Sequence, residues 1–300
     1  MSSKTKAEIK VTMAIIPTVD LSPFFTDEDH DGKKTAIDII KEACSEYGFF
    51  QIVNHGVPPE LMSRAIQLSK TFFSFPDEEK LKYSPGSGAP LPAGYSKQPD
   101  HSPDKNEYLL MFQPQSGFNK LPHNPPDFRD VLEEMFTYFR KTGEVIEKIV
   151  NECLGLPPGF LKEYNNDRSW DFMVALRYFL ATETENNGIT EHEDGNCFTF
   201  VIQDEVGGLE VLSNKKFKSA THRVVRSKEI SHHSFAFFYT LQGDKWVEPL
   251  PEFTQQIGEA PKYRGFMYKD YQAMRMRNKT HPPSKLEDAI TITHYAISSE

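Results

Sequence analysis

Two histidines and an aspartate in the C-terminal half have the residue types and spacing of a metal site. His192 and Asp194 stand two positions apart in ITEHEDGN, on or beside a predicted strand, so their side chains point to the same face. His222 follows in a second β-patterned run, KSATHRVV. Two imidazoles and one carboxylate can bind Fe(II) on one side and leave positions open for a chelating co-substrate and O₂. The set predicts a 2-His-1-carboxylate metal site.

The histidines that follow His222 need a different explanation. THRVVRSKEISHHSFAFFY holds His222, His232 and His233 within twelve positions. A His-x-Asp pair also occurs by chance in surface loops. The prediction of a metal site therefore depends on a second strand that brings His222 to the same point. A zinc hydrolase with the same three ligands is an alternative that metal analysis of the purified protein would decide.

The pattern along the chain indicates helices first and strands afterwards. Residues 59–75 and 127–153 carry apolar side chains at helical spacing, whereas residues 76–126 are rich in proline and are interpreted as loops. After Trp170 the chain changes to short β-patterned runs separated by turn signals. This order predicts an α+β, mainly β fold, in which a helical N-terminal region packs around a C-terminal sandwich or barrel.

Charge and composition exclude several kinds of partner. The net charge of −9 argues against nucleic acid, because binding a phosphate backbone needs a basic stripe. No run of about 18 apolar residues is present, and MSSKTKAEIKVT lacks the apolar stretch of a secretory signal. The three widely spaced cysteines form no disulfide framework, which fits a reducing compartment. We expect a cytoplasmic monomer without membrane or nucleic-acid partners.

Nearly the whole chain resembles the plant-type Fe(II)- and 2-oxoglutarate-dependent dioxygenases. The motifs that carry the resemblance are IPTVDLS, EYGFFQIVNHGVP, FFSFPDEEK, EHED, QDEVGGLEV, FKSATHRVV, HSFAFFY and VEPLPEF. The resemblance implies a double-stranded β-helix (jelly roll) with Fe(II) at its mouth, held by His192, Asp194 and His222. It also implies 2-oxoglutarate and O₂ as co-substrates, with ascorbate as a helper that keeps the iron reduced.

The same resemblance implies an oxidoreductase of plant specialised metabolism. Such an enzyme couples the conversion of 2-oxoglutarate to succinate and CO₂ with hydroxylation or desaturation of a small molecule. Flavonoids, gibberellin-like terpenoids and alkaloids are all handled by similar chains, and the pocket loops carry no readable code for one of them. The segment MYKDYQAMRMRNKTHPP is expected to form a helix over the pocket mouth, where it contributes to selectivity.

The resemblance also divides the chain into regions. A helical N-terminal part precedes the catalytic core, and the core is shortened between residues 212 and 213. The expected regions are a disordered tail at 1–14, an N-terminal non-haem dioxygenase region at 15–125, a long scaffold helix at 126–165, the jelly-roll core at 166–255, and a C-terminal helix and tail at 256–300.

The shortened core brings the predicted histidine ligands closer in sequence than is usual. His192 and His222 are 30 positions apart, about half the separation found in the family, because two strands after GGLEVL are absent. These two are edge strands, one on each sheet, so GGLEVL can join KFKSATHRVV through a hairpin at Ser213-Asn214. His222 then still reaches the metal, and two strand edges become exposed.

The anchor for 2-oxoglutarate also departs from the family. The family holds the far carboxylate with an Arg-x-Ser pair, and here that position reads His232-His233-Ser234. An imidazole is mostly neutral at pH 7 and cannot form the bidentate fork of a guanidinium. Its loss costs on the order of 2–4 kcal/mol of binding free energy. We expect His232 and Ser234 at the anchor and His233 as a filler that points away from the iron.

A milder departure concerns the strand ALRYF. The family often has Asn-x-Tyr here in contact with the co-substrate, whereas this chain has Arg177-Tyr178-Phe179. Phe179 has no hydroxyl, and Arg177 supplies charge only if it points inward. Tyr178 is expected on the opposite face. Arg177 and Tyr178, the residues of this motif that carry polar groups, are both included among the candidate 2-oxoglutarate residues.

Two functions remain compatible with these motifs. The first is an active oxygenase. The second is a catalytically impaired, truncated or splice-variant relative that acts at most through metal binding or protein contacts. Succinate formation that depends on Fe(II) and 2-oxoglutarate distinguishes the two, and a His232→Arg variant tests the altered anchor.

Overall fold

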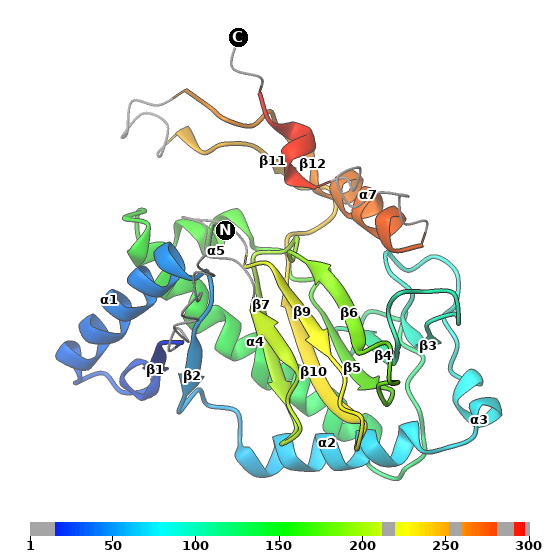
Figure 1. Cartoon of the computed structure of the whole chain (residues 1–300). Helices are drawn as coiled ribbons and strands as arrows, with labels where there is room; N and C mark the ends of the chain where they lie inside the picture. The colour runs from blue at the N-terminus through cyan, green and yellow to red at the C-terminus, as the bar shows by residue number, and fades with distance from the viewer. Residues whose placement is uncertain (1–15, 212–219, 252–259, 281–290, 298–300) are drawn as a thin grey trace, which may run out of the picture.

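The computed structural model describes residues 16–211, 220–251, 260–280 and 291–297 (Figure 1). The expected tail at 1–14 and the expected turn at Ser213-Asn214 lie outside the described residues. Within the described residues, no helix is long and apolar enough to cross a membrane.

The first half of the chain is mostly helical, as its apolar periodicity predicts. Its one small sheet is a parallel pair of short strands that flank the first helix. The expected helix at 59–75 is confirmed, and it ends at Phe73. Apart from two strands within residues 94–112, the elements up to Tyr164 are, in chain order, β1 (Thr18–Asp20), η1 (Ser22–Phe25), α1 (His30–Glu46), β2 (Gln51–Val53), α2 (Pro59–Phe73), α3 (Asp77–Leu81), α4 (Phe128–Cys153) and α5 (Phe160–Tyr164).

Two antiparallel sheets form the β part. The larger has the order β3-β4-β5-β10-β7 and the smaller the order β6-β9-β8. The mixed helix-and-sheet class is confirmed, and within the described residues the sheets do not close into a barrel. The strands are β3 (Gly94–Lys97), β4 (Asn106–Phe112), β5 (Phe172–Tyr178), β6 (Asn187–His192), β7 (Phe198–Gln203), β8 (Leu209–Val211), β9 (His222–Val225) and β10 (His232–Tyr239).

The interpretation of residues 76–126 as loops is wrong in part. They contain β3 and β4, and β4 pairs with β5 along its whole length. The segment NEYLLMF is almost entirely buried because both of its faces are covered. A strand buried on both sides lacks the alternation of apolar and polar residues by which a half-buried strand is recognised.

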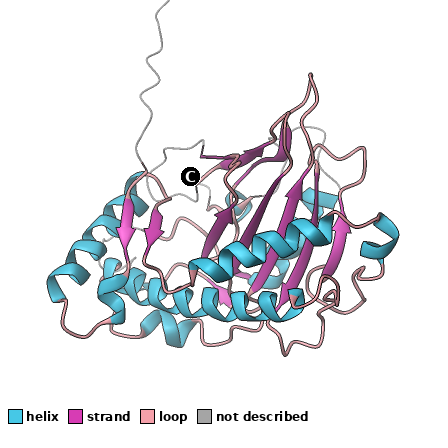
Figure 2. Cartoon of the chain, turned by 90° about the horizontal axis from the view of Figure 1, so that it is seen from below, coloured by secondary structure: helices cyan, strands magenta, loops and turns pink. Residues whose placement is uncertain are grey.

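Helices α2 and α4 cover one face of the larger sheet (Figure 2). Phe136 of α4 meets Phe237 of β10 edge-on at 5.1 Å between ring centroids. Tyr239 lies against the α4 backbone at Gly143, where a Cβ atom would stand 2.5 Å from the tyrosine ring. The helical layer therefore fixes the position and tilt of β10, which carries site residues on its opposite face.

The opposite face of the larger sheet packs against the smaller one. Val174, Leu176 and Ala236 of the larger sheet form a cluster with Val224 and Ile189 of the smaller. The two sheets thus enclose an apolar space between them, and the candidate site lies in this space.

Among the described residues, β7 and β8 are end strands of their sheets. β8 pairs antiparallel with β9, in the register Leu209↔Val224 and Val211↔His222. The expectation that GGLEVL and THRVV become antiparallel neighbours is confirmed.

The C-terminal part forms a small unit of its own. Trp246–Val247 (β11) pairs with Phe266–Met267 (β12), and the latter leads directly into α7 (Tyr268–Thr280). A short 3-10 helix, η3 (Ile292–Tyr295), packs Tyr295 against Phe266 at 4.2 Å between ring centroids. The expected C-terminal helix is confirmed as α7.

Candidate metal centre and pocket

Strand pairing brings the three predicted ligands together. β6 and β9 align His192 with His222, and Asp194 follows immediately after β6. One ligand atom from each residue lies within 4.8 Å of the others. The distance from Asp194 Oδ1 is 3.6 Å to His192 Nε2 and 3.9 Å to His222 Nε2. The short sequence separation of the histidines therefore does not keep them apart.

Backbone carbonyls orient both imidazoles in the same way. His192 Nδ1 lies 2.8 Å from the carbonyl of Thr190, and His222 Nδ1 lies 2.9 Å from that of Ala220. A carbonyl can only accept, so each Nδ1 carries the proton and each Nε2 directs its lone pair toward the other ligands. This arrangement is the usual outer support of a metal-binding histidine.

Thr199 of β7 orients the carboxylate. Its hydroxyl donates to Asp194 Oδ2 at 2.6 Å, which turns Oδ1 toward the two Nε2 atoms. Two imidazole nitrogens and one carboxylate oxygen, all facing one point, fit a divalent transition metal such as Fe(II). Sequence reasoning missed Thr199, because a threonine on a strand is ordinary until its register is known.

A cavity of about 450 Å³ extends from this point between the two sheets. Its walls are mainly apolar, with hydroxyl and amide groups at separated points. His192, Asp194 and His222 lie at its side together with Arg275 and Met276 of α7. The expectation that the C-terminal helix borders the pocket is confirmed.

The far end of the cavity contains the residues of the expected 2-oxoglutarate anchor. His232 and Ser234 of β10 and Tyr178 of β5 line it, and all three are buried. The Ser234 hydroxyl donates to the Tyr178 oxygen at 3.4 Å, and the Tyr178 and His232 rings lie 4.2 Å apart. The expectation that Tyr178 faces away from the pocket is wrong.

Arg177 lies on the other side of the sheet. Its guanidinium donates to Glu107 Oε1 and to the Phe73 carbonyl, each at 2.9 Å. Glu107 is fully buried and also accepts from Lys80 and Tyr95. Since neighbouring residues of a strand point to opposite faces, Tyr178 in the pocket requires Arg177 outside it. Arg177 therefore belongs to a structural ion-pair network and does not line the cavity.

Burial also determines the charge of His232. Burial in the sheet is the main cause that lowers its pKa below the usual histidine value, so the imidazole is neutral at pH 7. Gly208 lies against this ring, and a Cβ there would stand 2.6 Å from His232 Cε1. The anchor thus offers neutral hydrogen-bonding groups in a dry environment.

His233 points away from the cavity, as expected for a filler position. Its Nδ1 lies 3.6 Å from Asp204 Oδ2, and its ring lies beside Phe73 of α2. The three histidines of THRVVRSKEISHHSFAFFY, His222, His232 and His233, therefore have three different surroundings.

Comparison with known proteins shows the family of this chain. Residues 16–134 match the family described as the N-terminal region of non-haem dioxygenases in morphine synthesis. Flavonol synthase/flavanone 3-hydroxylase of Matthiola incana is 30% identical over 290 residues, covering 85% of this chain and 96% of that protein. 2-Oxoglutarate-dependent dioxygenase 19 of Oryza sativa subsp. japonica is 28% identical and covers 94% and 91%.

A solved structure has a similar overall fold. JOX2 in complex with 2OG, Fe and JA superposes with a TM-score of 0.76 at 25% identity, covering 92% of this chain and 89% of that one. The chain belongs to the plant-type Fe(II)- and 2-oxoglutarate-dependent dioxygenases. Members of this family are oxidoreductases that use Fe(II), 2-oxoglutarate and O₂.

Proposed function

We propose that this chain is an oxygenase that hydroxylates or desaturates a small plant metabolite of the flavonoid, terpenoid or alkaloid type. In this proposal His192, Asp194 and His222 hold Fe(II). The observation that carries it is the convergence of these three ligands, each supported by its own hydrogen bond, in a core that is shorter than the family's. Maintained support of this kind favours a working metal centre over a remnant.

The two facing sheets support the further proposal of a shortened jelly roll. β6, β9 and β8 would form one sheet, and β5, β10 and β7 the catalytic part of the other. The regions 15–125, 126–165, 166–255 and 256–300 remain the proposed division of the chain.

Each group at the site has a separate task in this proposal. Bound Fe(II) would supply the redox chemistry that couples O₂ and 2-oxoglutarate to substrate oxidation. The backbone carbonyls of Thr190 and Ala220 hold the imidazole protons on Nδ1, so that Nε2 stays available. Thr199 keeps the carboxylate turned to the same point. The facing sheets exclude water from the cavity.

The far carboxylate of 2-oxoglutarate would be held by neutral groups. The Tyr178 hydroxyl, which accepts from Ser234, can donate to it, and His232 lies beside them without charge. These groups fit 2-oxoglutarate, but hydrogen bonds from neutral donors contribute less than a guanidinium fork. The proposal therefore includes weak co-substrate binding.

A specific observation favours the second candidate, a catalytically impaired relative. The anchor lacks a cation, and β7 and β8 are both end strands among the described residues. Such a protein would bind metal and yet form no succinate.

The decisive experiment is an assay of succinate formation with Fe(II), 2-oxoglutarate and a panel of flavonoids, terpenoids and alkaloids. We expect succinate formation that a substrate stimulates and that His192→Ala abolishes. We also expect His232→Arg to tighten 2-oxoglutarate binding by roughly 10-fold or more, because a guanidinium contributes charge. Calorimetry under anaerobic conditions measures this affinity independently of turnover. Absence of succinate from the intact protein, with every substrate, would establish the impaired relative instead.

A further inference from the structure

The cavity beside the metal centre has one cationic side chain other than histidine among its described lining residues, Arg275 of α7. Two carboxylates also line the cavity, and both already accept from threonines. Asp104 accepts from Thr190, and Asp194 accepts from Thr199. These hydrogen bonds leave both carboxylates charged, so Arg275 is the described lining side chain, apart from the histidines, whose charge attracts an anion.

Arg275 is held in place by the segment that carries the metal ligand. Its Nη2 donates to the Glu193 carbonyl, and its Nη1 donates to the Tyr271 hydroxyl at 3.1 Å. Its stem lies against Gly195, where a Cβ would be 2.6 Å from Arg275 Cδ. Glu193 and Gly195 flank Asp194 in the chain, so the guanidinium is positioned next to the metal centre. A guanidinium has five N–H donors, and two such contacts leave donors for a ligand.

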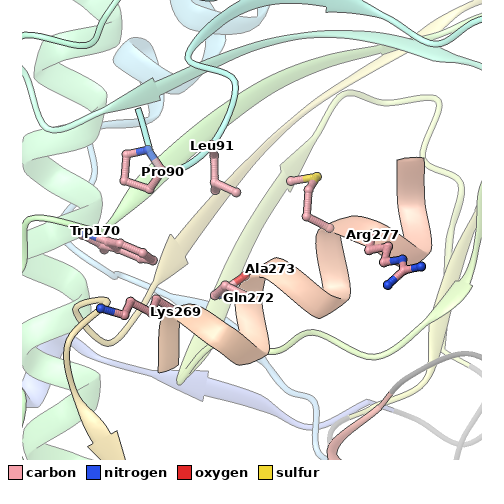
Figure 3. Close-up of a pocket in the computed structure, with 8 residues that line it drawn as sticks. Pro90, Leu91, Trp170, Lys269, Gln272, Ala273 and Arg277 are labelled. Atoms are coloured by element: carbon pink, nitrogen blue, oxygen red, sulfur yellow. The ribbon is translucent and has the colours of Figure 1, made fainter. Parts of the chain in front are cut away.

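A second cavity, of about 650 Å³ and here called the entrance, lies next to the first. Leu91, Gln272 and Met276 line both cavities, which makes the two neighbours along α7. Figure 3 shows Lys269, Gln272 and Ala273 on this helix beside Pro90, Leu91 and Trp170, with Arg277 toward the other end of the helix.

The entrance has a charge opposite to that of the whole chain. Its described lining residues include Lys269 and Arg277 and no acidic side chain. Lys269 also pairs with Asp244 at 2.6 Å. On a protein of net charge −9, a basic entrance attracts anions locally while the rest of the surface repels them.

We propose that the substrate is a small organic acid with an apolar body, and that Arg275 is the residue that selects it by binding its carboxylate. The apolar walls would hold the body between the sheets, and the entrance on α7 would admit the anion. A planar guanidinium suits this task because it meets a carboxylate through two parallel hydrogen bonds. This inference rests on the proposed function, since it names the substrate class of that oxygenase.

The test compares acids with their uncharged isosteres under conditions without turnover. The full chain is loaded anaerobically with Fe(II) and 2-oxoglutarate and titrated calorimetrically with 4-phenylbutyrate, cinnamate and decanoate, each beside its primary amide. We expect at least one acid to bind roughly 10- to 100-fold more tightly than its amide. In Arg275→Gln this ratio should fall to about one, and Arg275→Lys should restore part of it.

Lys269→Gln is the matched control on the same helix. It should keep the acid-to-amide ratio, because Lys269 lies only in the entrance and pairs with Asp244. The proposal is overturned if no acid binds better than its amide, or if Arg275→Gln keeps the ratio. Circular dichroism of each variant shows whether α7 is intact. Fe(II) and 2-oxoglutarate binding, measured in the same samples, tests the proposed function separately, because the ratio can be measured whether or not they bind.

Discussion

At the scale of single residues, the centre depends on groups that do not touch the metal. The three ligands would be flexible without the Thr190 and Ala220 carbonyls and the Thr199 hydroxyl. These contacts fix the tautomers and the carboxylate orientation before any ion binds. Such preorganisation reduces the entropy that binding must overcome.

The role of Thr199 can be tested directly. Thr199→Val removes the hydroxyl and keeps the shape, so Asp194 Oδ2 loses a donor at 2.6 Å. We expect the affinity for Fe(II) or Co(II) to fall by roughly 10- to 100-fold, the usual effect of losing an outer support. Metal titration by calorimetry measures it. Thr199→Ser keeps the donor and should bind metal almost normally, and equal affinities for the two variants would contradict this role.

At the scale of elements, β10 separates two chemistries on its two faces. His232 and Ser234 point into the cavity, whereas His233 points toward α2. The register with β5 sets this division, since His232 aligns with Tyr178 and His233 with Arg177. A slip by one residue would exchange the two sets and remove the site.

His233, on the face of β10 that packs against α2, should make the stability of the fold sensitive to acid. Burial is the main cause that lowers the pKa of His233 to about 4. Asp204 opposes this shift, and Lys70, Arg177 and His232 add to it. The unfolded chain, with a histidine pKa near 6.5, therefore binds more protons between about pH 6.5 and 4. The free energy of unfolding should fall over this range by on the order of 3 kcal/mol.

Chemical denaturation at a series of pH values measures this dependence. His233→Leu removes the titrating group and should flatten much of the slope between pH 6.5 and 4. His232 has its pKa lowered in the same direction and accounts for a remaining slope. Parallel curves for the wild type and the variant would show that His233 is not the origin.

At the scale of the whole molecule, the two sheets end in β7 and β8 among the described residues. β7 has the sequence FTFVIQ, which has no charge and high β propensity. An uncharged end strand offers its unpaired backbone groups to another chain. We therefore expect a monomer at low protein concentration and association through β7 at high protein concentration.

A charge on β7 should oppose such pairing. Val201 lies on this strand with 39% of its surface exposed and also lines the cavity, so Fe(II) binding by each variant is measured as well. Val201→Lys should lower the fraction of associated species at high protein concentration, because a second strand would have to desolvate the ammonium. Sedimentation velocity over a concentration series measures it. Val201→Thr is the neutral control, and no difference between the two variants would argue against β7 as the contact.

The sequence by itself determined the ligand types, the helices with strong apolar periodicity and the family. His192, Asp194 and His222 could be named because their chemistry and motifs are local properties. The helix over the pocket mouth could also be predicted, because its segment follows a motif of the family.

Only the tertiary structure decided which side chains share the cavity. Tyr178 and Arg177 are neighbours in sequence, and the strand register alone puts one in the cavity and the other in the Glu107 network. Thr199 and Arg275 reach the centre through pairing and packing between segments far apart in the chain. Such contacts depend on register and long-range packing, and residue types along one strand or helix do not encode either.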